Sequence, residues 1–238
     1  MSSRQEEKER RKQERLAREQ EIEKAERRRR LLGLFAGGVL GAAAIAAVVV
    51  AVLASGGGSD DPKPNVNDGP RVPIPAQKAT DLEDAAKDAG CTYRTFTPGA
   101  NDREHVNGTV SYKHNPPVFG PHAPTPSSDG NYAGQGPVDR EPLVHALEHG
   151  RLVIWYQSDL PKRRISQLET LFDEPIEGQP SGYKQLLVEA PDIPGQVAAS
   201  GWGHQLNCPR MTDKTFDALR TFRATAVDKG PETVPFGQ

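Results

Sequence analysis

The chain has 238 residues and a formal net charge of −2, and its apolar content of 35% is low for a globular protein. Its 21 prolines and 23 glycines indicate long irregular segments. Residues 1–30 hold 12 Lys or Arg against 8 Asp or Glu, whereas the rest of the chain holds 18 against 24. A basic N-terminal segment therefore precedes an acidic body, and the acidic body argues against nucleic-acid binding.

The N-terminal quarter of the chain has the pattern of a membrane anchor. Residues 1–30 are predicted to form a charged, solvated helix, followed at 31–54 by 24 uncharged, mostly apolar positions. The alternative, a cleaved signal peptide, has a shorter apolar run and a shorter leading segment. Arg27–Arg30 abut the apolar run, and the positive-inside rule then places the N-terminus in the cytoplasm. We expect a single-pass protein of the cell membrane, with the lipid bilayer as its partner along 31–54.

The remainder of the chain is then expected outside the cytoplasm. Residues 55–79 predict a linker, flexible where Gly-rich and extended where Pro-rich. Cys91 and Cys208 are the only two cysteines, and an extracytoplasmic compartment permits their oxidation. One disulfide between them is predicted, and a reactive or metal-bound thiol pair is the alternative.

Residues 80–238 are predicted to form one α+β domain with helices packed on a mainly antiparallel sheet. A capping box at Thr80–Glu83 and a stop at Gly90 predict its first helix. Asn107-Gly108 predicts a hairpin between residues 103–106 and 109–112. The other predicted elements are strands at 91–97, 151–157, 184–190 and 196–202 and helices at 160–173 and 212–229.

A long segment, residues 113–142, has little predicted regular structure. Segments of this length inside a compact domain are uncommon, and they usually carry function or are disordered. This one contains His114 and His122. One functional hypothesis is therefore a metal-free interaction module that offers this loop to protein partners in the cell envelope.

The stretch EPLVHALEHGRLVIWYQ (141–157) contains the pattern H-x-x-E-H at His145–His149. Histidines four residues apart lie on one face of a helix and can share an ion, whereas on a strand they lie about 13 Å apart. Asp139 as N-cap, Pro142 in the first turn and Gly150 just after the end favour a short helix. A hairpin that turns at EHGR remains the alternative, because Leu143, His145 and Leu147 also alternate.

All six histidines fall between residues 105 and 204, which raises the question of whether they converge. The hypothesis we favour is a divalent transition-metal site with His122, His145 and His149 as ligands, supported by His105 and Glu148. Imidazoles without thiolates suit Zn or Cu(II). A third hypothesis is a zinc hydrolase of the HxxEH type, in which Glu148 is the catalytic base. In the structural alternative, the histidines bond backbone carbonyls and fix the long loop to the sheet.

Four segments resemble an uncharacterised bacterial family, the domain of unknown function 3105: NGTVSY (107–112), NPPVFGPH (115–122), VHALEHGRLVIWY (144–156) and GWG (201–203). Members typically carry an N-terminal membrane anchor ahead of the domain. The resemblance extends over about residues 80–235 and implies that five residues belong to the family pattern, namely His105, His122, His145, Glu148 and His149. His114 and His204 do not clearly match it, and no activity follows from the resemblance.

Overall fold

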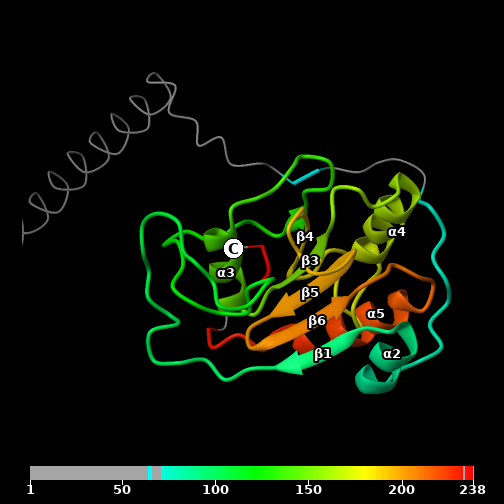
Figure 1. The fold of residues 1–238 in the computed structure, drawn as a ribbon, viewed down its shortest axis with the longest axis horizontal. Coiled ribbons are helices and arrows are strands. Elements are labelled where there is room, and N and C mark those ends of the chain that lie inside the picture. Colours follow the sequence, from blue (N-terminus) through cyan, green and yellow to red (C-terminus); the bar gives the residue numbers. More distant parts are fainter. Residues whose placement is uncertain (1–63, 66–70, 233, 238) are drawn as a thin grey trace, which may run out of the picture. The chain divides into compact units, whose positions relative to one another are not determined.

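The computed structural model describes residues 64–65, 71–232 and 234–237 (Figure 1). The predicted charged helix and membrane anchor lie outside these ranges. Within the described residues, no helix is long and apolar enough to cross a bilayer. In chain order the elements are α2 (Leu82–Ala89), β1 (Thr92–Thr95), β2 (Gly130–Asn131), α3 (Arg140–Glu148), β3 (Leu152–Tyr156), α4 (Lys162–Asp173), β4 (Gln185–Glu189), β5 (Val197–Gly201), β6 (His204–Cys208) and α5 (Thr215–Ala226).

The strands form one mixed sheet in the order β1-β6-β5-β3-β4-β2. Strands β1, β6, β5 and β3 pair antiparallel, whereas β4 pairs parallel with both β3 and β2. The α+β class is confirmed, and the expected mainly antiparallel sheet is in fact mixed. The reason is α4, because a helix between β3 and β4 lets the chain cross over and lay β4 parallel to β3.

Both faces of the sheet are covered, because successive side chains of a strand point to opposite sides. Leu152, Ile154 and Tyr156 of β3 face one core, together with α2, α4 and α5. Val153 and Trp155 face a second core, together with α3 and parts of the long loop. Figure 1 shows α2 and α5 near β1 and β6, and α3 near the C-terminal segment. Helix α3 therefore belongs to a separate layer from the other three helices.

The elements predicted from periodicity are confirmed, with small shifts at their ends. Helix α2 is capped by the side chain of Asp81, which accepts from the Asp84 amide at 3.0 Å, so the predicted cap at Thr80 is wrong by one residue. Gly90 ends the helix in the left-handed conformation as predicted, at φ 70°. Strand β6 was not among the predicted elements.

The predicted hairpin around Asn107-Gly108 is absent from the described residues. His105 instead forms an isolated parallel bridge with His122, in which the Val106 amide donates to His122 O at 2.8 Å and the His122 amide donates to Glu104 O at 2.9 Å. The turn signal at 107–108 is local, whereas the partner of this segment lies further along the same loop.

The segment between β1 and β2 is irregular but packed. Val118 is buried and its carbonyl accepts from the Gly203 amide at 3.0 Å. Gln205 Nε2 donates to Pro116 O at 2.7 Å, and Asn115 Nδ2 donates to Asp192 O at 2.6 Å. The loop is therefore held against the second face of the sheet, where α3 also lies.

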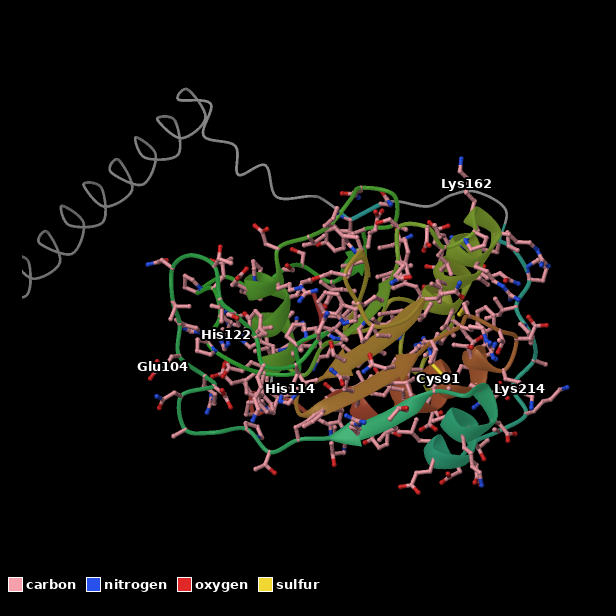
Figure 2. All side chains as sticks on the ribbon, in the orientation of Figure 1. Cys91, Glu104, His114, His122, Lys162 and Lys214 are labelled. Atoms are coloured by element: carbon pink, nitrogen blue, oxygen red, sulfur yellow. A yellow bond between two sulfur atoms is a disulfide. The ribbon has the colours of Figure 1, made fainter. Side chains whose placement is uncertain are left out.

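Two connections fix the ends of the domain. Cys91 and Cys208 form the predicted disulfide, which joins the residue before β1 to the last residue of β6 at the first core. Upstream of Thr80, the Val72 and Pro73 carbonyls accept hydrogen bonds from side chains of α4, each at 2.8 Å. Figure 2 shows Cys91 beside α2, and His114 and His122 at the loop-rich end of the domain.

Candidate metal centre

Helix α3 positions the first half of the site. It spans Arg140–Glu148, so the helical interpretation of this stretch is confirmed and the hairpin alternative is wrong. Gly150, at φ 78°, follows the cap, and its amide donates to Leu147 O at 3.0 Å while the Arg151 amide donates to Ala146 O at 3.0 Å. This pair of bonds is a Schellman motif. The helix stops one residue before His149, which leaves His145 and Glu148 buried on it.

The long loop supplies the second half of the site. The bridge between His105 and His122 brings both rings next to α3. The ring centroids of His105 and His122 each lie 4.8 Å from that of His145. His122 is completely buried, whereas His105 is exposed at the mouth of the site. The predicted convergence of histidines from separate segments is therefore present in the structure.

Four side chains form the centre: His105, His122, His145 and Glu148. One ligand atom from each lies within 4.8 Å of every other. Ligands about 2.1 Å from a tetrahedral ion lie about 3.4 Å from one another. A contraction of at most about 1.4 Å between any two atoms would thus bring this set to coordination distance. We call these four residues the His3Glu centre.

Two of its histidines are oriented by the backbone of the loop. His122 Nδ1 lies 2.8 Å from Gly120 O, and His145 Nδ1 lies 2.7 Å from Ala123 O. A carbonyl oxygen can only accept, so in both rings Nδ1 carries the hydrogen and donates it. In the neutral ring Nε2 then holds a lone pair, which lies 3.0 Å from Glu148 Oε2 in His122 and 3.0 Å from His149 Nε2 in His145. Metal-binding histidines typically donate their other N–H in this manner.

The contact between His122 and Glu148 is favourable only with a proton or a metal ion between its two atoms. Its two atoms, His122 Nε2 and Glu148 Oε2, are 3.0 Å apart and both residues are buried. With Nδ1 donating to Gly120, a neutral His122 has only a lone pair to offer to the carboxylate oxygen. Two lone pairs at this distance repel each other unless a proton or a metal ion lies between them.

Burial keeps the neighbouring imidazoles neutral. Desolvation is the main cause that lowers the pKa of His145, and the nearby rings of His149, His122 and His105 act in the same direction. Against the opposing effect of the Ala123 carbonyl, this pKa is lowered to about 4. Desolvation also lowers the pKa of His149, and the positive charge of Arg151 acts in the same direction. A neutral imidazole is the form that binds metal ions.

His149, predicted as a ligand, lies beside the His3Glu centre and not within it. Its Nε2 is 3.0 Å from His145 Nε2 and 3.3 Å from Glu232 Oε2. Together with Glu148 and Glu232 it forms a second group of ligand atoms within 4.8 Å of one another. The sequence-based set of five thus divides into four residues of one centre and one residue of an adjacent group.

Two charged residues of the site were not predicted. Arg103 Nε donates to Glu148 Oε1 at 2.6 Å, and its Nη2 donates to Glu232 Oε1 at 2.5 Å. These hydrogen bonds, above all the one to Glu148, raise the pKa of Arg103. Glu232 lies in the C-terminal segment, outside any predicted element, and nothing in its local sequence marks it.

The remaining histidines lie outside the site, in agreement with the resemblance. His114 packs its ring against Phe96 and Phe119, with centroids 4.1 and 5.5 Å away. His204 Nδ1 is 2.7 Å from the Tyr93 hydroxyl on the neighbouring strand. Both are therefore suitable controls for substitutions in the centre.

Comparison with known proteins gives one match. A family described as a protein of unknown function (DUF3105) matches residues 105–234, which is more than half of the chain and includes the His3Glu centre, His149 and Glu232. No curated protein and no solved structure matches the chain.

Proposed function

This chain belongs to the DUF3105 family of proteins of unknown function, and we propose that it binds a divalent transition-metal ion through His105, His122, His145 and Glu148. The observation that carries the proposal is the orientation of two rings. His122 and His145 each donate Nδ1–H to a loop carbonyl, which leaves a lone pair on Nε2. Nε2 of His122 lies 3.0 Å from Glu148 Oε2, and Nε2 of His145 lies 3.0 Å from His149 Nε2. At His122, an ion beside the carboxylate would meet a lone pair without the ring having to turn.

The composition of the centre limits the metal. Three imidazoles and one carboxylate suit Zn or Cu(II). Thiolate ligands are excluded, because both cysteines are joined in the disulfide. The exposed position of His105 provides an entry path from solvent.

Metal content of the purified full chain tests the proposal. We expect one tightly bound Zn or Cu(II) ion at the centre, and a loss of at least about 100-fold in its affinity for the variants His122→Ala and His145→Ala. His114→Ala is the matched control, since His114 is a partly buried histidine of the same loop outside the site. Unchanged affinity in His122→Ala would refute the proposal.

Two other hypotheses receive less support from the geometry. As a hydrolase base, Glu148 would have to act on a bound water, whereas its two oxygens face His122 and Arg103. As a contact surface, the long loop does not offer Pro116, Pro117 and Val118 near its start, because these residues are buried. Metal binding therefore remains the proposal.

We also propose that the domain lies outside the cytoplasm, held by a single membrane anchor at residues 31–54. Support comes from the apolar run itself and from the arginines before it. The disulfide between Cys91 and Cys208 adds to this support, because disulfides persist in oxidising compartments.

A further inference from the structure

We propose that Glu148, His149 and Glu232 form a second cation site, which shares Glu148 with the His3Glu centre and which the guanidinium of Arg103 fills when no second ion is bound. The inference rests on the proposed function in one respect, since a shared carboxylate bridges two ions only if the first ion binds. The species bound at this second site is a divalent transition-metal ion.

The two carboxylates are arranged as bridges. Glu148 directs Oε2 toward His122 at 3.0 Å and Oε1 toward Arg103 at 2.6 Å. Glu232 directs Oε2 toward His149 at 3.3 Å and Oε1 toward Arg103 at 2.5 Å. Each carboxylate thus has one oxygen on a histidine and the other on the same guanidinium. A carboxylate with two diverging oxygens can ligate one ion with each.

Arg103 marks the place where positive charge is stabilised. Its guanidinium bridges Glu148 and Glu232, so the two carboxylates already bind a cation in this state. The Arg103 side chain is about half exposed, at 49%, and Glu232 is exposed to 41%. The exposed Arg103–Glu232 pair contributes little to stability. Glu148 is buried, so the incoming ion must itself supply the positive charge that the guanidinium gives up there.

His149 can provide the nitrogen ligand. Its Nε2 faces two acceptors, the lone pair of His145 Nε2 at 3.0 Å and Glu232 Oε2 at 3.3 Å. One N–H cannot bond both well. Nδ1 of His149 makes no hydrogen bond within the described part of the chain, so the proton can move there and leave Nε2 free for an ion.

Backbone contacts hold Glu232 beside the helix end. The Glu232 amide donates to Glu148 O at 3.1 Å, and the Asp228 amide donates to Gly150 O at 2.9 Å. Between them, Gly230 lies so close that a Cβ there would be 2.2 Å from Glu148 O. We call residues 228–232 the C-terminal clamp. The clamp fixes the third ligand independently of any ion.

The ligand set predicts the class of the second ion. One imidazole and two carboxylates are richer in oxygen than the His3Glu centre, so this site accepts Zn and harder ions such as Mn(II). In two-metal sites the ions lie about 3.5–4 Å apart. The second ion is predicted to bind more weakly, because it must displace Arg103 and meets the positive charge of the first.

Zinc counting on the full chain in detergent tests the inference. We expect two ions per chain at saturation for the wild type and one for Glu232→Gln, an exposed position where the substitution should leave the fold intact. Arg103→Gln should tighten the second ion about tenfold, since a competing positive charge is removed. Glu83→Gln, an exposed glutamate of α2, is the matched control and should keep both ions.

Copper adds a test of adjacency. With Cu(II), the electron paramagnetic resonance signal should grow with the first equivalent and weaken with the second, because close ions couple. Two ions, loss of one in Glu232→Gln and this coupling together support the inference. One ion in both wild type and Glu232→Gln overturns it and leaves the proposed function standing. No bound ion overturns both.

Discussion

At the scale of single residues, the ability of the site to bind an ion depends on which ring nitrogens carry hydrogen. The Gly120 and Ala123 carbonyls each take a ring proton, on His122 and His145. Glu148 is buried and has one strong donor, Arg103, on one oxygen only. Its other oxygen faces the Nε2 atom of His122. The ion-free protein must therefore place a proton between Glu148 and His122, and an ion would replace that proton.

Substitution of Glu148 should show whether Nε2 of His122 holds a lone pair or a proton in the ion-free protein. In Glu148→Gln the amide can donate to Nε2 and still accept from Arg103, so without metal we expect a loss of stability within about 1 kcal/mol. Glu148→Ala leaves the buried Nε2 of His122 without its partner and takes from Arg103 one of its two carboxylates, so it should cost about 2 kcal/mol or more. Both variants should lose the ion of the His3Glu centre.

Urea unfolding in the presence of a chelator measures these differences. Equal destabilisation by Gln and Ala would mean that His122 is an imidazolium ion paired with Glu148, since the amide cannot replace the charge.

At the scale of elements, α3 and the C-terminal clamp act together. Helix α3 ends at Glu148, and the carbonyls of Glu148 and of Gly150, just after the helix, accept from the clamp. Gly150 makes this approach feasible in two respects. Its φ of 78° suits glycine, and a Cβ there would lie 3.1 Å from Asp228 Cα. The helix end therefore positions both the centre and the segment that carries Glu232.

Replacing Gly150 by alanine should separate these effects. In Gly150→Ala the alanine must adopt the left-handed conformation, and its Cβ also contacts the clamp. We therefore expect a loss in the free energy of unfolding clearly above about 1–2 kcal/mol. Gly134→Ala is the control, because Gly134 has φ 77° with nothing within 4 Å of its Cβ position. The alanine at 134 should cost only the conformational part. Thermal unfolding compares the two, and equal losses would contradict the role of the clamp.

Elements with a clear local period were predictable, and contacts between distant segments were not. Helix α3 was recognisable because Pro142 and Gly150 delimit it in the sequence. The hairpin prediction failed because Asn107-Gly108 specifies a turn without specifying a partner, and the backbone of His105 pairs with His122 instead. For the same reason Arg103 and Glu232 were missed, since they reach Glu148 only through the fold.

At the scale of the whole molecule, one sheet separates two cores with different tasks. The face with α2, α4 and α5 contains the disulfide and most of the large apolar side chains. The face with α3 and the long loop carries the site. The disulfide closes a loop with a sequence separation of 117, for which chain entropy alone gives about 5 kcal/mol of stabilisation. The face with the disulfide thus supplies stability, and the opposite face is the one on which ions would bind.

The state of the two thiols in cells tests the proposed location. When cells are quenched in acid and treated with a mass-tagged maleimide, the full chain should carry no tag, and it should carry two after reduction. It should also sediment with membranes and require detergent for release. Deletion of residues 31–54 is the control and should abolish sedimentation. Two tags without reductant, or a full chain that stays in the supernatant, would contradict the proposal.

The loop carbonyls that take the ring protons have one further consequence. Small zinc-dependent domains fold only when their ion binds. In this protein, hydrogen bonds to main-chain carbonyls and a packed helix already hold the ligands in place. The guanidinium of Arg103 supplies positive charge beside Glu148 when no ion is bound. Loading and unloading would then be exchange reactions on a finished scaffold, limited by how fast ligands leave the ion and not by how fast the chain refolds.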